Sequence, residues 1–147
     1  MNLTTKGLIL KEQNIGERDK LVTVLTEERG VLRAFVRGAK SVKSKKQAAT
    51  TKFCYARLSL YSGKDSYIID EAEALEMFFG LRDDLEKLAL GEYFLELGLI
   101  FSPEEENARD NLRLLLNSLY MLANGKRPPE MLKALTELRL LTLGGYA

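Results

Sequence analysis

The spacing of apolar residues changes once along this 147-residue chain, and that change constrains the fold more than any other feature. Before about residue 75, apolar and polar residues alternate, as in strands that bury one face. After it, apolar residues recur at the three- and four-residue spacing of helices that bury one stripe. The sequence therefore predicts an α+β protein, all-β over residues 1–74 and all-α over residues 75–147.

Five strands are predicted in the first part, with short turns everywhere except between the third and the fourth. Three strands in an antiparallel meander, then a long loop and a hairpin, are typical of a small, partly closed barrel of the OB type. The predicted strands cover residues 3–11, 20–26, 30–37, 53–61 and 67–72.

Three helices are predicted in the second part, joined by short links that indicate a compact bundle. They cover about residues 83–101, 108–123 and 128–143. Asp83 with Asp84, and Glu104 to Glu106, fall where helices would begin, so their carboxylates have an electrostatic role there and do not indicate an acid/base pair or a metal site. Gly91 and Gly98 either weaken the first helix or let a neighbour approach closely.

The third strand has one apolar face and one cationic face. Leu32, Ala34 and Val36 alternate with Arg33, Phe35 and Arg37, and a basic loop follows that contains Lys40, Lys43, Lys45 and Lys46. Long cations neutralise phosphates and an aromatic ring can stack on an unpaired base, so this stretch suits a polyanion. A solvated strand face with a disordered basic loop, unused by the core, explains the same pattern, and both interpretations stay open.

The fourth strand also mixes rings and an arginine on its outward face. Arg57 lies there with Phe53, Tyr55 and Tyr61, and we predict that these three rings pack beneath the following helices. For Phe35, which lies between two arginines, binding is the preferred interpretation. Phe35 and Arg57 therefore join the cations of the third strand and loop as candidate contacts to nucleic acid.

The near-neutral total charge conceals two oppositely charged halves. Residues 1–60 have a net charge of +8 and residues 61–147 a net charge of −7. This split indicates a first part that faces nucleic acid and a second part with another role.

The absence of histidine excludes Ser-His-Asp and Cys-His nucleophiles, and the single cysteine, Cys54, is predicted to be a small core residue. No bilayer-spanning run or signal peptide is visible, so we expect a cytoplasmic protein that is not an enzyme.

The order and spacing of several short stretches resemble the bacterial recombination mediator RecO family, over nearly the whole chain. The stretches are Ile15-Gly16-Glu17, Leu21 to Thr26, Arg37-Gly38-Ala39-Lys40, Lys43-Ser44, Gly63-Lys64, Glu71-Ala72-Glu73, Leu81-Arg82, and Tyr93 with Glu96.

The resemblance implies an OB-fold followed by a helical domain in a non-enzymatic protein of recombinational DNA repair, located in the cytoplasm at the nucleoid. Such proteins bind single- and double-stranded DNA, anneal complementary strands, and load the recombinase together with RecR and the single-stranded DNA-binding protein. Matched by position, the DNA contacts would be Arg33, Arg37, Lys40, Lys43, Lys45 and Lys46. Lys40 replaces an arginine of the family pattern, which keeps a phosphate contact without bidentate geometry.

Many family members continue into a segment with a four-cysteine zinc site, which this sequence lacks, so no zinc and no other cofactor is expected. The sequence is either a truncated form or a short member. Its third helix would then expose Leu138 and Leu141, and we expect self-association. Two other functions stay open: a protein-interaction module that docks its partner through the helical half, and an OB-fold RNA-binding protein.

Overall fold

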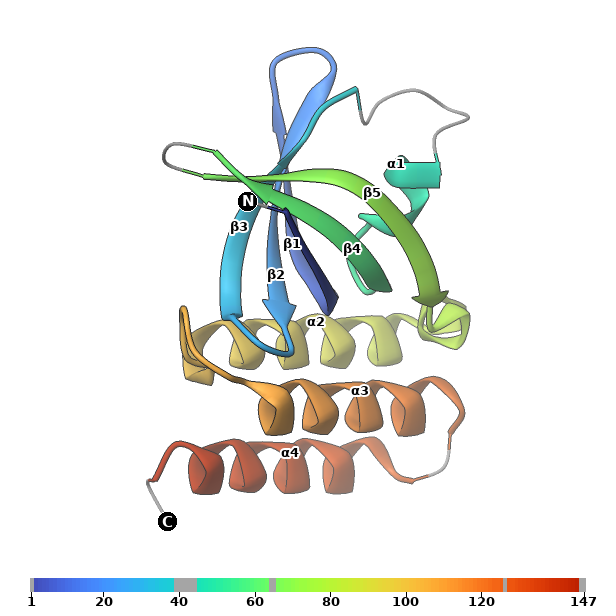
Figure 1. Cartoon of the computed structure of the whole chain (residues 1–147). Coiled ribbons are helices and arrows are strands. Elements are labelled where there is room, and N and C mark those ends of the chain that lie inside the picture. Colours follow the sequence, from blue (N-terminus) through green and yellow to red (C-terminus); the bar gives the residue numbers. More distant parts are fainter. Residues whose placement is uncertain (1, 39–44, 64–65, 126, 146–147) are drawn as a thin grey trace.

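The computed structural model describes residues 2–38, 45–63, 66–125 and 127–145, and it places a five-stranded barrel on three stacked helices (Figure 1). The closed strand order is β1-β2-β3-β5-β4, and only β3 and β5 pair in parallel. The predicted α+β class and OB-type barrel are confirmed. The strands are β1 (Asn2–Ile15), β2 (Asp19–Thr26), β3 (Gly30–Val36), β4 (Tyr55–Ser62) and β5 (Tyr67–Glu76).

The helical layer begins with a 3₁₀ turn, η1 (Phe79–Asp83), and continues through α2 (Leu85–Phe101), α3 (Arg109–Ala123) and α4 (Pro129–Leu143). All three predicted helices are present near their predicted bounds. Asp84 caps α2, because its Oδ1 accepts hydrogen bonds from the amides of Glu86 and Lys87 at 2.7 and 3.3 Å. No helix among the described residues has the length and apolar character needed to cross a membrane.

The strands β1 and β5 are longer than predicted. β1 continues to Ile15, beyond the predicted end at residue 11, and the chain turns at Gly16, whose φ is +63°. The β1–β2 hairpin consequently projects beyond the barrel (Figure 1). Sequence periodicity missed this extension because residues 12–14 are all polar and show no alternation.

A short helix, α1 (Lys45–Ala49), interrupts the connection between β3 and β4. We predicted a basic loop here, and residues 45–49 form a helix instead. Ala49 is 1% exposed and packs in the barrel interior, while Lys45 and Lys46 form the first turn of the helix. Five residues are too few to show helical periodicity, so no local pattern indicated this element.

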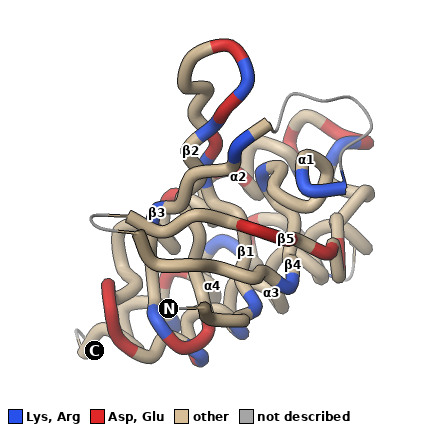
Figure 2. Tube along the Cα trace, turned by 45° about the horizontal axis from the view of Figure 1, so that its top comes forward, with Lys and Arg blue, Asp and Glu red and all other residues tan. Residues whose placement is uncertain are grey.

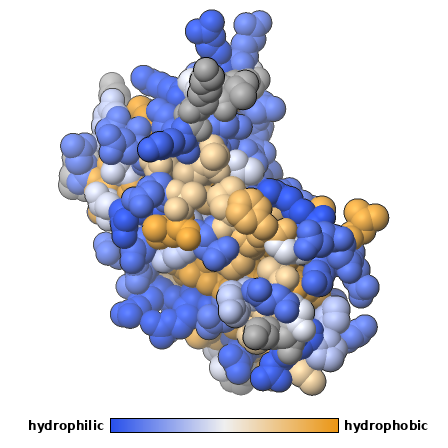
Figure 3. All heavy atoms as spheres, turned by 90° about the vertical axis from the view of Figure 1, so that its right-hand side faces the viewer, coloured by the Kyte–Doolittle hydropathy of each residue, from blue (hydrophilic) through white to orange (hydrophobic). Residues whose placement is uncertain are grey.

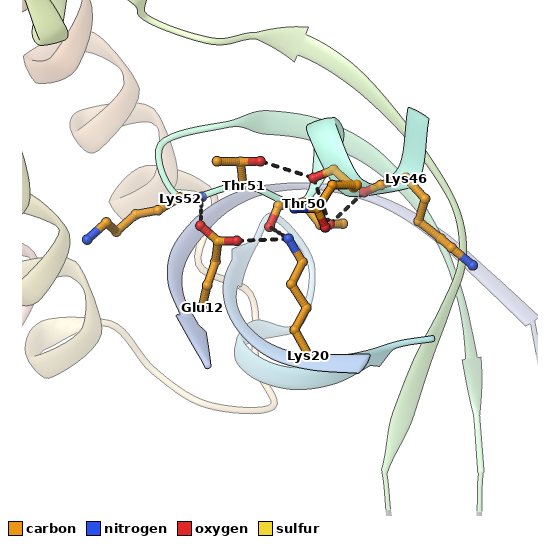
Figure 4. Close-up of polar contacts among 7 residues, drawn as sticks. Glu12, Lys20, Lys46, Thr50, Thr51 and Lys52 are labelled. Carbon is orange, nitrogen blue, oxygen red and sulfur yellow. Dashed lines mark hydrogen bonds and ion pairs between the residues drawn. The ribbon is translucent and has the colours of Figure 1, made fainter. Parts of the chain in front are cut away.

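An ion pair between a buried lysine and a half-buried glutamate lies under α1 (Figure 4). Lys20, 2% exposed, donates from Nζ to Oε1 of Glu12 at 2.8 Å and to the carbonyl of Thr50 at 3.0 Å. The other carboxylate oxygen of Glu12 accepts the amide of Lys52 at 2.9 Å. The Nζ of Lys20 and both carboxylate oxygens of Glu12 thus have hydrogen-bond partners, as buried charges require. The pair thus fixes the segment between α1 and β4 to the β1–β2 hairpin.

The protein has two apolar cores, one on each side of the barrel wall. Inside the barrel, the register pairs Val22 with Ala34 and Val24 with Leu32, and all four are buried. Outside it, Leu8, Leu10, Leu25 and Val31 pack against buried residues of α2 and α3, among them Phe94, Leu115 and Leu119. Burying each large apolar side chain contributes about 1.5–3 kcal/mol, so the helices are held to the barrel by this second core.

Glycine controls how closely α2 meets its neighbours. A Cβ added at Gly98 would lie 2.3 Å from Cδ1 of Leu115 on α3, and one at Gly91 would lie 3.1 Å from the ring of Phe53. The predicted close approach is confirmed at Gly98, whereas the neighbour of Gly91 is the segment before β4.

The predicted role of Glu104 to Glu106 at a helix start was wrong. The helix α3 begins at Arg109, with Ala108 as its N-cap residue, and Glu104 instead forms β-bridges with Gly30 and Val31. The acidic link between α2 and α3 therefore crosses the beginning of β3. This tertiary contact, between residues far apart in the sequence, is invisible to local helix-start rules.

Candidate nucleic-acid interface

The third strand presents its cations as the alternation predicted. Leu32, Ala34 and Val36 are buried in the barrel, Arg33 is exposed on the outer face, and Phe35 is half-buried beside it. Arg37 follows the last residue of β3 and is exposed. Within the described part of the chain, neither Arg33 nor Arg37 forms an ion pair.

The chain turns sharply after Arg37. Gly38 has a φ of +66°, which residues with a Cβ adopt at a cost, and its amide donates to Oδ1 of Asp19 at 3.0 Å. This contact ties the beginning of the basic connection to the β1–β2 hairpin, next to its turn. The next two predicted contacts, Lys40 and Lys43, lie outside the described residues.

A groove of about 480 Å³ lies between the outer face of β3 and the β4–β5 hairpin, which reaches over β3 in Figures 1 and 2. Its apolar lining includes Leu21 and Phe35, which are cross-strand partners. Arg33 and Glu105 supply opposite charges, and the hydroxyl of Tyr67 donates to Oε2 of Glu105 at 3.3 Å. Sequence reasoning missed Tyr67 and Glu105, because folding brings them to β3 from distant segments.

Lys45 and Lys46 are not brought to this groove. Lys45 is exposed and Lys46 half-buried at the beginning of α1. Both views of the chain trace place α1 and β3 on opposite sides of the barrel (Figures 1 and 2). These two lysines therefore extend the basic surface over the end of the barrel and do not join the groove.

Arg57 lies in different surroundings from Arg33. Its Nη1 is 3.2 Å from Oε2 of Glu73, its cross-strand neighbour on β5. The strand β5 carries four carboxylates, and Figure 2 shows them as red segments of its trace. In the barrel, β5 lies between β4 and β3. The structure thus keeps Arg57 apart from the cations of the third strand. The four are Asp70, Glu71, Glu73 and Glu76.

The rings of the fourth strand divide into two kinds. Phe53 is 3% exposed and Tyr55 is half-buried, and both pack against the helical core, as predicted. Tyr61 is 43% exposed, so the prediction that it packs beneath the helices was wrong. Tyr61 is the second-last residue of β4, whose end points away from the helices (Figure 1).

The single cysteine has the environment of a core residue. Cys54 is fully buried inside the barrel, and burial raises the pKa of its thiol to about 11. The sulfur therefore stays protonated at neutral pH and is a poor nucleophile. Among the described residues, no cluster of three or more potential metal-ligating side chains is present.

Apolar side chains are exposed in two places on the helical layer. On α4, Leu138 is 57% and Leu141 37% exposed, which confirms that part of the prediction. Around η1, Phe79 is 69% exposed and Leu85 85% exposed, and Figure 3 shows apolar residues on the side of the molecule where the barrel meets the helices. The described structure therefore offers apolar surface as well as a basic strand face.

Two family profiles together match almost the entire chain. The profile described as Recombination protein O N terminal matches residues 1–78, and the one described as Recombination protein O C terminal matches residues 82–147.

Curated relatives show the same similarity. The chain is 36% identical over 145 residues to the DNA repair protein RecO of Acetivibrio thermocellus, covering 99% of this chain and 58% of the relative. It is 41% identical over 142 residues to the DNA repair protein RecO of Clostridium novyi, covering 97% and 56%. The chain thus spans a little over half the length of these relatives.

Proposed function

The chain belongs to the RecO family of DNA repair proteins, and from this premise we propose that it binds single- and double-stranded DNA through the outer face of β3. The observation that carries the proposal is the pair of exposed arginines, Arg33 and Arg37, which have no acidic partner among the described residues and flank the ring of Phe35. Unpaired cations beside an accessible ring suit a phosphate backbone with unstacked bases.

We further propose that the protein anneals complementary strands and supports loading of the recombinase, together with RecR and the single-stranded DNA-binding protein. Two DNA strands repel one another, and a cationic surface that holds both lowers this repulsion without any catalytic residue. Lys40, Lys43, Lys45 and Lys46 are proposed as further DNA contacts. Arg57 is the weakest member of the proposed site, because Glu73 already neutralises it.

A second role is favoured by the exposed leucines of α4. Leu138 and Leu141 form apolar surface that water does not favour, so the helical half is proposed to dock a protein partner or a second copy of the chain. Analytical ultracentrifugation of the wild type and a Leu138→Glu variant tests self-association. Loss of a concentration-dependent dimer in the variant supports it, and a monomeric wild type at high concentration contradicts it.

The test of DNA binding is fluorescence anisotropy of labelled single-stranded DNA, titrated with protein at several salt concentrations. We expect a linear fall of log affinity with log salt. Neutralising both arginines in an Arg33→Gln, Arg37→Gln variant should make that slope shallower by roughly 1.4, because each phosphate contact on a single strand contributes about 0.7. Competition with RNA of the same sequence separates DNA from RNA binding.

The matched control neutralises two exposed arginines of the helical layer. Arg82→Gln with Arg127→Gln changes the net charge by the same amount at positions remote from β3. Its affinity and salt slope should stay near the wild-type values. Equal losses in both variants would show that only net charge matters, and absence of binding at low salt would overturn the proposal for this chain.

A further inference from the structure

We propose that the groove beside β3 holds one unpaired nucleobase of single-stranded DNA, so that the site reads the base as well as the phosphate. This inference rests on the proposed DNA binding and adds to it a chemical role for Tyr67 and Glu105. Phosphate binding alone needs only the cations, whereas the groove also has an apolar floor and a polar edge.

The floor of the groove suits a flat ring. Leu21 and Phe35 face each other across β2 and β3 on the outer surface, and Phe35 is half-buried, so one part of its ring remains accessible. Tyr67, at the beginning of β5, supplies a second ring, and the hairpin residues Ser62 and Ser66 form the far wall. Bases stack on aromatic side chains irrespective of their identity, because every base has a π-face.

The two charged residues of the groove give a bound strand one orientation. Arg33 attracts a phosphate, and the carboxylate of Glu105 repels one. The backbone would therefore run over Arg33 and Arg37, with the base directed toward Tyr67 and Glu105. Glu105 has a φ of +56°, a conformation that few residues other than glycine adopt, and in it the side chain meets the hydroxyl of Tyr67.

The polar edge selects unpaired bases that carry an amino group. An ionised carboxylate only accepts hydrogen bonds, so Glu105 can receive the amino group of cytosine, adenine or guanine, whereas unpaired thymine offers only the single N–H of its ring. In a duplex these amino groups are already paired and the base is stacked. We therefore expect the groove to favour a single strand over a duplex, and cytosine over thymine.

The experiment compares three labelled single strands of equal length by anisotropy: oligo-dC, oligo-dT, and an abasic strand with the same number of phosphates. The wild type should bind oligo-dC about tenfold more tightly than the abasic strand, since one stacked base is worth a factor of this order. Phe35→Leu, which keeps apolar volume but removes the ring, should bind oligo-dC and the abasic strand nearly equally. Glu105→Gln should reduce the difference between oligo-dC and oligo-dT.

Tyr67→Ala has a matched control in Tyr61→Ala. Both tyrosines lie on the β4–β5 ladder, but Tyr61 does not line the groove. Tyr67→Ala should lose preference for a strand with bases, and Tyr61→Ala should retain it. Circular dichroism and thermal unfolding establish that each variant is folded before its affinities are compared.

The outcomes separate this inference from the proposed function. If oligo-dC, oligo-dT and the abasic strand bind the wild type equally, with a salt dependence that Arg33→Gln with Arg37→Gln weakens, DNA binding stands and the base site is overturned. If Tyr61→Ala and Tyr67→Ala lose the preference equally, the groove is likewise overturned. If no strand binds at low salt, both proposals fail together.

Discussion

The outer faces of β3 and β4 have nearly the same local pattern and different surroundings. Each has an arginine next to aromatic residues, Arg33 beside Phe35 on β3 and Arg57 beside Tyr55 on β4. On β3 the arginine is unpaired among the described residues and borders a groove. On β4 the arginine contacts Glu73 and the tyrosine packs on helices.

The difference shows that the neighbouring strand and layer decide what an outward pattern does. β3 lies beside a hairpin that overhangs it, whereas β4 lies beside the acidic strand β5 and, at one end, against the helical core. The same residue types are therefore available for a ligand on β3, whereas on β4 they make contacts within the protein. The following substitutions break or sharpen this contrast.

The largest expected effect is on stability, in a comparison of Phe53 with Phe35. Phe53→Ala removes a ring that is 3% exposed and contacts Gly91, so it should lower the free energy of unfolding by about 3–5 kcal/mol. Phe35→Ala removes a half-buried ring and should cost about 1 kcal/mol. Urea unfolding measures both. Equal losses would mean that Phe35 belongs to the core and is not held for a ligand.

The next effect is expected for the two arginines on DNA affinity. Arg33→Glu should weaken single-strand binding by roughly 10–100-fold, because the variant loses a charge-assisted hydrogen bond to a phosphate and places a negative charge there instead. Arg57→Glu should change it by less than about threefold, because Glu73 and its neighbours already make that area acidic. Anisotropy at one fixed salt concentration compares them. A larger loss at Arg57 would move the interface to β4.

The smallest expected effect is the contribution of the Arg57–Glu73 ion pair to stability. Arg57 and Glu73 are both substantially exposed, and exposed pairs contribute about 0.2–1 kcal/mol. A double-mutant cycle with Arg57→Ala and Glu73→Ala should return a coupling energy in this range. A coupling energy well above it would show that the pair organises β4 and β5, and that Arg57 is structural in a stronger sense than its exposure indicates.

The sequence was sufficient for the order of the elements and the face that each strand buries. Alternation over residues 32–36 and the N-cap at Asp84 are local signals, and they were interpreted correctly. It was insufficient wherever a residue's role depends on a distant neighbour. Lys20 looks like an ordinary strand lysine until Glu12 and Thr50 meet it, and Glu104 looks like part of a helix start until it forms bridges with the beginning of β3.

The candidate site divides in the same way. Arg33, Phe35 and Arg37 followed from period-two alternation alone. Tyr67 and Glu105 could not be predicted, since the parallel contact of β5 with β3 and the course of the α2–α3 link carry no local signal. Sequence reasoning thus found one wall of the groove and missed the other.

Of the strand pairs that close the barrel, the pair that carries the groove, β3 with β5, has the shortest described ladder. Among the described residues, β3 and β5 pair only through Ala34 with Tyr67 and Phe35 with Ile68, whereas β1 and β2 pair from Gly7 with Thr26 to Ile15 with Asp19. Amide protons along this short seam should exchange with deuterium sooner than those of the β1–β2 ladder, because local opening begins where the fewest bonds hold. Phe35 and Tyr67 belong to both the seam and the groove, so any molecule that occupies the groove also lengthens the lifetime of the closed barrel.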